Sequence, residues 1–228
     1  MASNPYYITE EPRSSAAAGV HSLLIILHGY GADERDLMAL AAYFDPRLRV
    51  VSIRAPLDLP QGGHAWFPLE FTEEGVKIER EDVEQARDDL MEVVRNQQVV
   101  HGNDATNTLL LGFSQGAAMA LAVAFRAPDT TANVIALSGV FAPEMIPADS
   151  DVLRVLEATS IIMTHGSHDP VISIQQSHDA RDLVAQTPVR LQYHEYSMGH
   201  EINQECLRDV VEWVAAAVDA SQKGDRAP

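Results

Sequence analysis

The stretch "LLLGFSQGAAMAL", residues 109–121, joins two different patterns at one serine. The leucines before Gly112 form a short apolar run of the kind found in buried strands, and the small apolar residues after Gly116 suit a closely packed helix. A sharp turn at Ser114 would raise its hydroxyl above the edge of a sheet, and larger side chains at the two glycine positions would collide with that turn. The stretch therefore predicts an α/β fold with a candidate nucleophile at Ser114.

The rest of the chain alternates short apolar runs with helical patterns. Strands are expected at 22–29, 48–54, 107–112, 133–139, 160–166 and 189–196, and helices at 33–44, 79–96, 115–126, 173–185 and 201–219. This alternation favours a mostly parallel central sheet with helices on both faces. Two longer irregular stretches, 55–78 and 140–159, follow strands, where ligands bind in open α/β sheets. The second stretch is too short for a large cap domain.

The length of 228 residues suits one domain over residues 1–228. Within it, residues 1–18 are expected to be a loose N-terminal segment, with an antiparallel edge strand at "YYIT" (6–9). Residues 221–228 are expected to be a flexible tail.

Composition excludes several classes of protein. Apolar residues make up 46% of the chain, enough for a substantial core, yet no apolar run is long enough to insert stably in a membrane. The first residues lack a basic start and an apolar segment, so the expected location is cytoplasmic. The single Cys206 excludes an internal disulfide.

The net charge of -17 disfavours nucleic acid and anionic membrane surfaces as partners, because the protein's field repels them. Lys77 and Lys223 are the only lysines. Such a surface suits an ordinary acidic enzyme or one adapted to salt, and both interpretations stay open.

A serine hydroxyl needs a base to become a good nucleophile. In hydrolases with a G-x-S-x-G turn, an acid and then a histidine follow the serine along the chain. His178 falls in a helical pattern and His194 in the middle of a strand. His200 lies in a loop after the last strand, at the same edge of the sheet as Ser114, and is therefore the predicted base.

The acid is expected at the end of the strand that lies between Ser114 and His200. Asp169 stands there, in a turn set by Pro170, where its carboxylate would orient the histidine ring. Asp149 and Asp151 are rivals for this role, but they lie in a loop after an earlier strand.

Two backbone N–H groups are expected to stabilise a developing oxyanion. One belongs to Gln115, directly after the nucleophile, and the other to Tyr30 in the glycine-rich stretch "LHGYGAD" (27–33). This stretch does not match a phosphate-binding loop. His165 and His168 lack the spacing of a metal site, so no metal and no cofactor is expected.

Trp66, Phe67 and Leu69 in the stretch 55–78 are candidate substrate-binding residues. They would form an apolar lip for an acyl chain. For the two aromatic residues the alternative, that they simply pack the loop onto the protein, stays open.

Five motifs occur in an order that resembles a known family. They are "LHGYGADERDL", "GGHAWF", "GFSQGAAMAL", "HGSHDPVI" and "MGHEI", and the resemblance runs from about residue 20 to residue 218. The chain resembles the carboxylesterase / acyl-protein thioesterase / lysophospholipase family of small α/β-hydrolases. Tyr30 and Pro68 stand where animal thioesterases usually have leucine and often have aspartate, so the resemblance is closer to the bacterial carboxylesterases.

The resemblance implies an α/β-hydrolase fold without a large cap, with Ser114, Asp169 and His200 as catalytic triad and Tyr30 and Gln115 in the oxyanion hole. The implied activity is hydrolysis of short- to medium-chain acyl esters, thioesters or lysophospholipids through an acyl-enzyme, and a homodimer is compatible with it. Alternatives are an acyl-protein thioesterase proper, a related hydrolase on the same fold, and a non-catalytic binding protein. Dienelactone-type hydrolases usually carry cysteine at the position of Ser114.

Overall fold

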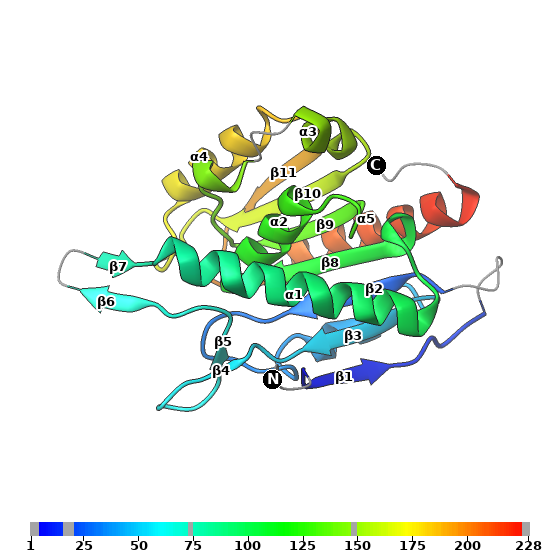
Figure 1. The fold of residues 1–228 in the computed structure, drawn as a ribbon, viewed down its shortest axis with the longest axis horizontal. Coiled ribbons are helices and arrows are strands. Elements are labelled where there is room, and N and C mark those ends of the chain that lie inside the picture. The colour runs from blue at the N-terminus through cyan, green and yellow to red at the C-terminus, as the bar shows by residue number, and fades with distance from the viewer. Residues whose placement is uncertain (1–4, 16–20, 73–74, 147–149, 225–228) are drawn as a thin grey trace.

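The computed structural model describes residues 5–15, 21–72, 75–146 and 150–224, and a seven-stranded sheet forms its centre (Figure 1). The strand order is β1-β3-β2-β8-β9-β10-β11, and all neighbours are parallel except β1 and β3. These strands are β1 (Tyr7–Glu10), β2 (Leu23–Leu27), β3 (Arg49–Ile53), β8 (Thr108–Phe113), β9 (Asn133–Leu137), β10 (Ser160–Gly166) and β11 (Arg190–Tyr196). The expectation of a mostly parallel sheet is confirmed.

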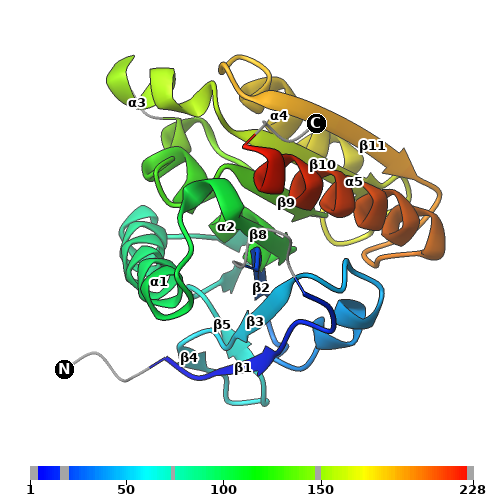
Figure 2. The same ribbon diagram turned by 90° about the vertical axis from the view of Figure 1, so that its right-hand side faces the viewer.

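Helices cover both faces of this sheet (Figure 2). The helices α1 (Arg80–His101), α2 (Gln115–Arg126), α3 (Ser150–Leu156) and α4 (Ile174–Val184) pack on one face. The short 3₁₀ helix η1 (Met38–Ala42) and the long helix α5 (Gln204–Lys223) pack on the other. Two further 3₁₀ turns are η2 (Ala105–Asn107) and η3 (Pro143–Met145).

Both faces of the central strands are buried, which explains their continuous apolar sequences. In β2, Leu23, Ile25 and Leu27 enter the core under α1 and α2, whereas Leu24 and Ile26 enter the core under α5. Successive side chains of a strand point to opposite faces, so one run of five apolar residues serves two cores.

The prediction of a regular α-helix at 33–44 is wrong. The chain makes successive turns there, followed by the short 3₁₀ helix η1. Its backbone hydrogen bonds join residues three apart, as from the Leu40 N–H to the Leu37 carbonyl oxygen. The buried Glu34 is held by Arg54 at the end of β3, which fixes the start of this segment against the sheet. Leu37 and Ala41 are nevertheless buried, as the pattern predicts.

The two irregular stretches contain small elements of their own. Residues 55–78 carry the strands β4 (Leu57–Asp58), β5 (His64–Ala65), β6 (Glu70–Thr72) and β7 (Gly75–Lys77), which form two separate antiparallel pairs. Figure 1 shows the β6–β7 pair projecting beyond the start of α1. The stretch 140–159 contains η3 and α3, and no large cap is present among the described residues.

The described parts of both terminal segments contact the rest of the protein, and the edge strand expected at 6–9 is present as β1. The strand β1 pairs antiparallel with β3 at the sheet edge, and the Arg13 guanidinium donates hydrogen bonds to three carbonyl oxygens of residues 41–44. At the other end α5 continues to Lys223, so the tail expected from 221 is helical there. This part of α5 contacts the start of β2, since the hydroxyls of Ser221 and Ser22 lie 3.1 Å apart. No helix of the described chain is both long enough and apolar enough to cross a membrane.

Candidate active site

Ser114 occupies a strained turn between β8 and α2. Its φ is 54° and its ψ is -116°, a region that costs a non-glycine residue about 1–3 kcal/mol. A Cβ at Gly112 would lie 2.1 Å from the Gly116 carbonyl oxygen, and one at Gly116 would lie 2.2 Å from the Leu27 carbonyl oxygen. Only glycine therefore permits the close approach of strand and helix that this turn requires.

His200 reaches Ser114 from the loop between β11 and α5. Its Nε2 lies 2.9 Å from the Ser114 Oγ, and its ring packs against the Phe113 ring with centroids 4.8 Å apart. The aromatic contact limits the positions of the imidazole, so the histidine is held over the serine.

Asp169 completes a hydrogen-bonded chain of three side chains. Its Oδ2 lies 2.7 Å from the His200 Nδ1, and its Oδ1 accepts hydrogen bonds from the Val171 and Ile172 N–H groups. Burial raises the pKa of the Asp169 carboxyl, but the hydrogen bonds from Ile172, His200 and Val171 outweigh it and leave the pKa below its usual value. A carboxylate only accepts, so Nδ1 carries the proton and Nε2 accepts from the serine hydroxyl.

His165 supports the turn that holds Asp169. It is fully buried, its Nε2 donates to the Ile172 carbonyl oxygen at 2.9 Å, and the same atom lies 3.5 Å from the Asp169 Oδ2. From the sequence, His165 was a candidate only for a metal site, and its position beside Asp169 was not predicted. Its place directly after the largely apolar run "SIIMT" (160–164) is the signal that would have indicated a buried histidine.

The glycine-rich stretch 27–33, which contains Tyr30, lies directly against Ser114. A Cβ at Gly29 would lie 3.4 Å from the Ser114 Cβ. Gln115 is the first residue of α2, and the first N–H groups of a helix have no partner within it. The start of α2 and the stretch that contains Tyr30 therefore both adjoin Ser114, and the positive end of the α2 dipole favours negative charge there. The oxyanion donors themselves stay a prediction.

The side chain of Gln115 also has a structural role, which was not predicted from the sequence. Its Oε1 accepts from the Trp66 N–H at 2.9 Å, and its Nε2 donates to the Phe67 carbonyl oxygen at 2.8 Å. Gln115, the residue after Ser114, therefore holds the backbone of the stretch 55–78 close to the site through two hydrogen bonds, which form a clamp.

This clamp favours the alternative left open for Trp66 and Phe67, in which they pack the loop onto the protein. Both side chains are buried, and the Trp66 indole N–H donates to the His28 carbonyl oxygen at 2.8 Å. Hydrogen bonds from the Trp66 N–H groups and to the Phe67 carbonyl oxygen hold this segment against the protein. Leu69 is half-buried and packs against the same core. Contact of Trp66, Phe67 and Leu69 with substrate stays a prediction.

His28, at the end of β2, joins the glycine-rich stretch to its neighbours. Its Nδ1 donates to the Gly29 carbonyl oxygen at 2.8 Å, and its Nε2 accepts from the Ala55 N–H at 3.0 Å. Burial lowers the pKa of His28, which keeps the ring neutral and able to make both bonds. No role of His28 was predicted from the sequence.

The other polar residues considered from sequence lie apart from Ser114. His178 pairs with Glu195 at 2.7 Å, and Asp151 pairs with Arg154 on α3. The His194 ring stacks on Tyr196, and Asp149 lies outside the described residues. Over the part of the chain that the structure describes, no group of three or more metal-ligating side chains is arranged around a common centre.

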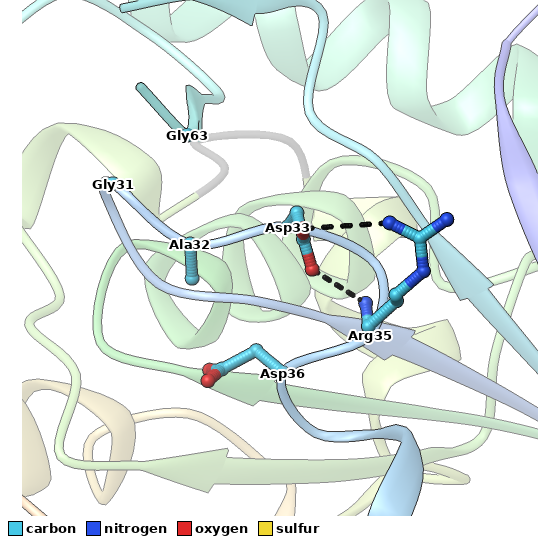
Figure 3. Close-up of a pocket in the computed structure, with 6 residues that line it drawn as sticks. All are labelled: Gly31, Ala32, Asp33, Arg35, Asp36 and Gly63. Carbon is cyan, nitrogen blue, oxygen red and sulfur yellow. Dashed lines mark hydrogen bonds and ion pairs between the residues drawn. The ribbon is translucent and has the colours of Figure 1, made fainter. Parts of the chain in front are cut away.

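A pocket of about 400 Å³ lies on the outer side of the glycine-rich stretch (Figure 3). It is lined by Gly31, Ala32, Asp33, Arg35, Asp36 and Gly63. The Asp33 carboxylate accepts the Arg35 N–H at 2.8 Å, so part of its polar lining is already paired. This pocket is polar and suits an acyl chain poorly.

The fold and the arrangement around Ser114 define the class of α/β-hydrolases. Residues 11–218 match the phospholipase/carboxylesterase family, and the chain belongs to that family of ester hydrolases. Esterase YpfH of Escherichia coli strain K12 is 30% identical over 89% of this chain and 84% of its own length. Acyl-protein thioesterase 1 of Kluyveromyces lactis is 26% identical over 90% and 96%. The crystal structure of esterase PE8 has a TM-score of 0.79 at 28% identity, covering 93% of this chain and 99% of that one.

Proposed function

We propose that this protein is a serine carboxylesterase that hydrolyses short- to medium-chain acyl esters through a Ser114–His200–Asp169 triad. The observation that carries the proposal is the continuous hydrogen-bonded chain from the Ser114 Oγ through the His200 ring to the Asp169 carboxylate. Such a chain makes a serine hydroxyl nucleophilic, because the histidine accepts its proton during attack.

The reaction proceeds in two steps. The Ser114 Oγ attacks the ester carbonyl carbon while the His200 Nε2 takes its proton, and the resulting oxyanion rests on the N–H groups of Gln115 and Tyr30. His200 then donates the proton to the departing alcohol, which leaves an acyl-serine. A water molecule attacks this acyl-serine in the same way and releases the acid, and the ionised Asp169 stabilises the imidazolium in both steps.

A thioester is the second candidate substrate, supported by the similarity to a yeast acyl-protein thioesterase. The same geometry serves both reactions, since an ester and a thioester form the same type of oxyanion. Parallel assays of a p-nitrophenyl ester and an acyl-coenzyme A of equal chain length rank the two activities.

The test is Ser114→Ala with p-nitrophenyl butyrate as substrate. We expect the rate to fall by at least about a thousandfold, because the triad acts as a unit. Ser167→Ala is the matched control at the same edge of the sheet, and it should retain activity. Circular dichroism checks folding, and labelling with a fluorophosphonate probe should occur in wild type and be lost only with Ser114. Retained activity in folded Ser114→Ala, or unlabelled wild type, contradicts the proposal.

A further inference from the structure

His165, near the end of β10, is a fully buried polar side chain that the proposed reaction does not use. Its Nε2 lies 2.9 Å from the Ile172 carbonyl oxygen, and since a carbonyl oxygen only accepts, Nε2 carries a proton. Its Nδ1 is buried and has no hydrogen-bond partner among the described residues. An apolar side chain would avoid the cost of burying this nitrogen. The group that His165 contributes here is therefore the Nε2–H donor.

This donor lies beside the carboxylate of the proposed triad. The His165 Nε2 is 3.5 Å from the Asp169 Oδ2, and both side chains are fully buried. The same Oδ2 lies 2.7 Å from the His200 Nδ1, so two imidazole rings approach one carboxylate oxygen. The contact at 3.5 Å is too long for a strong hydrogen bond. His165 therefore acts mainly through its bond to Ile172, on the position of Asp169.

Ile172 links His165 to the acid. Its N–H donates to the Asp169 Oδ1 at 2.9 Å, and its carbonyl oxygen accepts from the His165 ring. Pro170 and Val171, between these two groups, are exposed, so side-chain packing holds the turn 169–172 only weakly. The hydrogen bond from His165 ties this turn to the buried end of β10.

The residue after His165 fixes the same strand end against the loop that carries His200. A Cβ at Gly166 would lie 2.3 Å from the Gly199 carbonyl oxygen and 2.4 Å from that of Met198, so the two segments are in close backbone contact. The end of β10 is therefore a common support. It contacts the loop of the base through Gly166 and the turn of the acid through His165.

We propose that His165 is a positioning residue whose Nε2–H fixes the turn 169–172 and thereby aligns Asp169. The inference rests on the proposed function and adds a residue to its machinery. Without this donor the carboxylate shifts, the His200 ring loses its orientation, and proton transfer from Ser114 slows. Asp169 is buried and acts through His200, so the loss should appear in kcat and leave KM nearly unchanged.

The test uses two amides of different reach, with p-nitrophenyl butyrate as substrate. The amide nitrogen in His165→Gln stands as many bonds from the backbone as Nε2, whereas that in His165→Asn stands as many as Nδ1. We expect His165→Gln to keep kcat within about threefold of wild type, because it restores the donor. His165→Asn and His165→Leu should lower kcat by about 10- to 100-fold with KM within about twofold.

Gln98→Leu is the matched control for the loss of a buried donor. The Gln98 Nε2 donates to the Thr108 hydroxyl and to the Thr130 carbonyl oxygen, and Thr108 begins β8 at the end opposite Ser114. This variant should lose stability in urea unfolding and keep the wild-type kcat.

The Nδ1 proton of His200 reports the contact with Asp169 directly. Its far-downfield NMR resonance should persist in His165→Gln and Gln98→Leu and move upfield in the asparagine and leucine variants. A purely structural role of His165 would leave this resonance and kcat unchanged in every folded variant.

Wild-type kcat in folded His165→Leu and His165→Asn overturns the proposal, and so does an equal loss in the glutamine and asparagine variants. The asparagine variant keeps a polar side chain, so it tests the proposal where the leucine variant fails to fold. Failure of both to fold would assign His165 to folding alone and overturn the proposal as well. Absence of fluorophosphonate labelling and of all ester turnover in the wild type contradicts the proposed function itself.

Discussion

At the residue scale, the site depends on positions where a single side chain or its absence decides the geometry. Ser114 adopts a strained backbone conformation, and Gly116 lets α2 touch the end of β2. Strain of this kind persists only where the surrounding structure enforces it. Here the packed strand β8, the loop 27–33 and the helix α2 all meet at the serine.

Gly116→Ala tests this packing. The added Cβ would lie 2.2 Å from the Leu27 carbonyl oxygen and 2.7 Å from that of His28, so the helix and the loop bearing Tyr30 must separate. We expect the free energy of unfolding to fall by about 1–3 kcal/mol and kcat to fall about 100-fold, because misplaced groups lose catalytic geometry.

Gly199→Ala is the matched control, since its Cβ would approach nothing closer than the Pro170 Cδ at 3.9 Å. Urea unfolding and steady-state kinetics measure both variants. Wild-type values for Gly116→Ala would show that the helix can move without cost to the site.

At the element scale, the loop between β2 and η1 is anchored by a buried ion pair. The Glu34 carboxylate is fully buried and accepts two hydrogen bonds from the Arg54 guanidinium, at 2.6 Å and 2.9 Å. The Arg54 guanidinium also lies over the Tyr6 ring, 4.1 Å from its centroid. This arrangement ties the loop that carries Tyr30 to β3 and to the segment before β1.

Glu34→Gln should cost about 3 kcal/mol of unfolding free energy at neutral pH, because it leaves the Arg54 charge without its buried partner. The hydrogen bonds from Arg54 are the main cause that lowers the pKa of Glu34 from 4.5 to about 2. Since the folded-state pKa lies below the unfolded one, its stabilisation is present above pH 4.5 and is lost as pH falls toward about 2.

Urea unfolding between pH 2 and pH 7 measures this difference, and the variant should show a flatter decline over the same window. The exposed pair of Asp151 with Arg154 supplies a control, as Asp151→Asn should change stability by no more than about 0.5 kcal/mol. Parallel acid profiles of wild type and Glu34→Gln would contradict the assignment.

At the scale of the whole molecule, one mostly parallel sheet brings together side chains that are far apart in sequence. Ser114, Asp169 and His200 follow β8, β10 and β11, and these parallel strands all end at one edge. The chain as a whole is acidic, with 33 aspartates and glutamates against 16 lysines and arginines. Self-repulsion at such a charge destabilises the compact state.

Salt should therefore stabilise the protein at neutral pH. Raising NaCl from low concentration to about 0.5 M screens the repulsion, and we expect a gain of about 1 kcal/mol, a rise in Tm of about 2–4 °C. Scanning calorimetry measures the shift. The same titration near pH 4.7, where the chain carries little net charge, is the control and should show a smaller rise. A Tm that falls with salt at neutral pH would show that the surface ion pairs outweigh the net repulsion.

The sequence by itself determined the order of the elements and the three residues of the hydrogen-bonded chain. Apolar runs and helical patterns are local features of the sequence, and the two glycines that flank Ser114 indicate its turn. The bounds of β8, β10 and α2 could therefore be predicted to within a residue or two. The choice of Asp169 and His200 followed from strand ends, because parallel strands share one edge.

Only the tertiary structure decided where side chains with two plausible environments lie. Trp66 has the same apolar ring in a lip or in a core, and its burial depends on partners 38 and 49 residues away. Glu34 falls in the helix expected at 33–44, but the segment forms turns and the Glu34 side chain is buried against Arg54. The apolar cavity lined by Phe67, Val83 and Ala118 likewise arises between α1, α2 and the segment after β9. Such outcomes follow from contacts between distant segments, which no local pattern encodes.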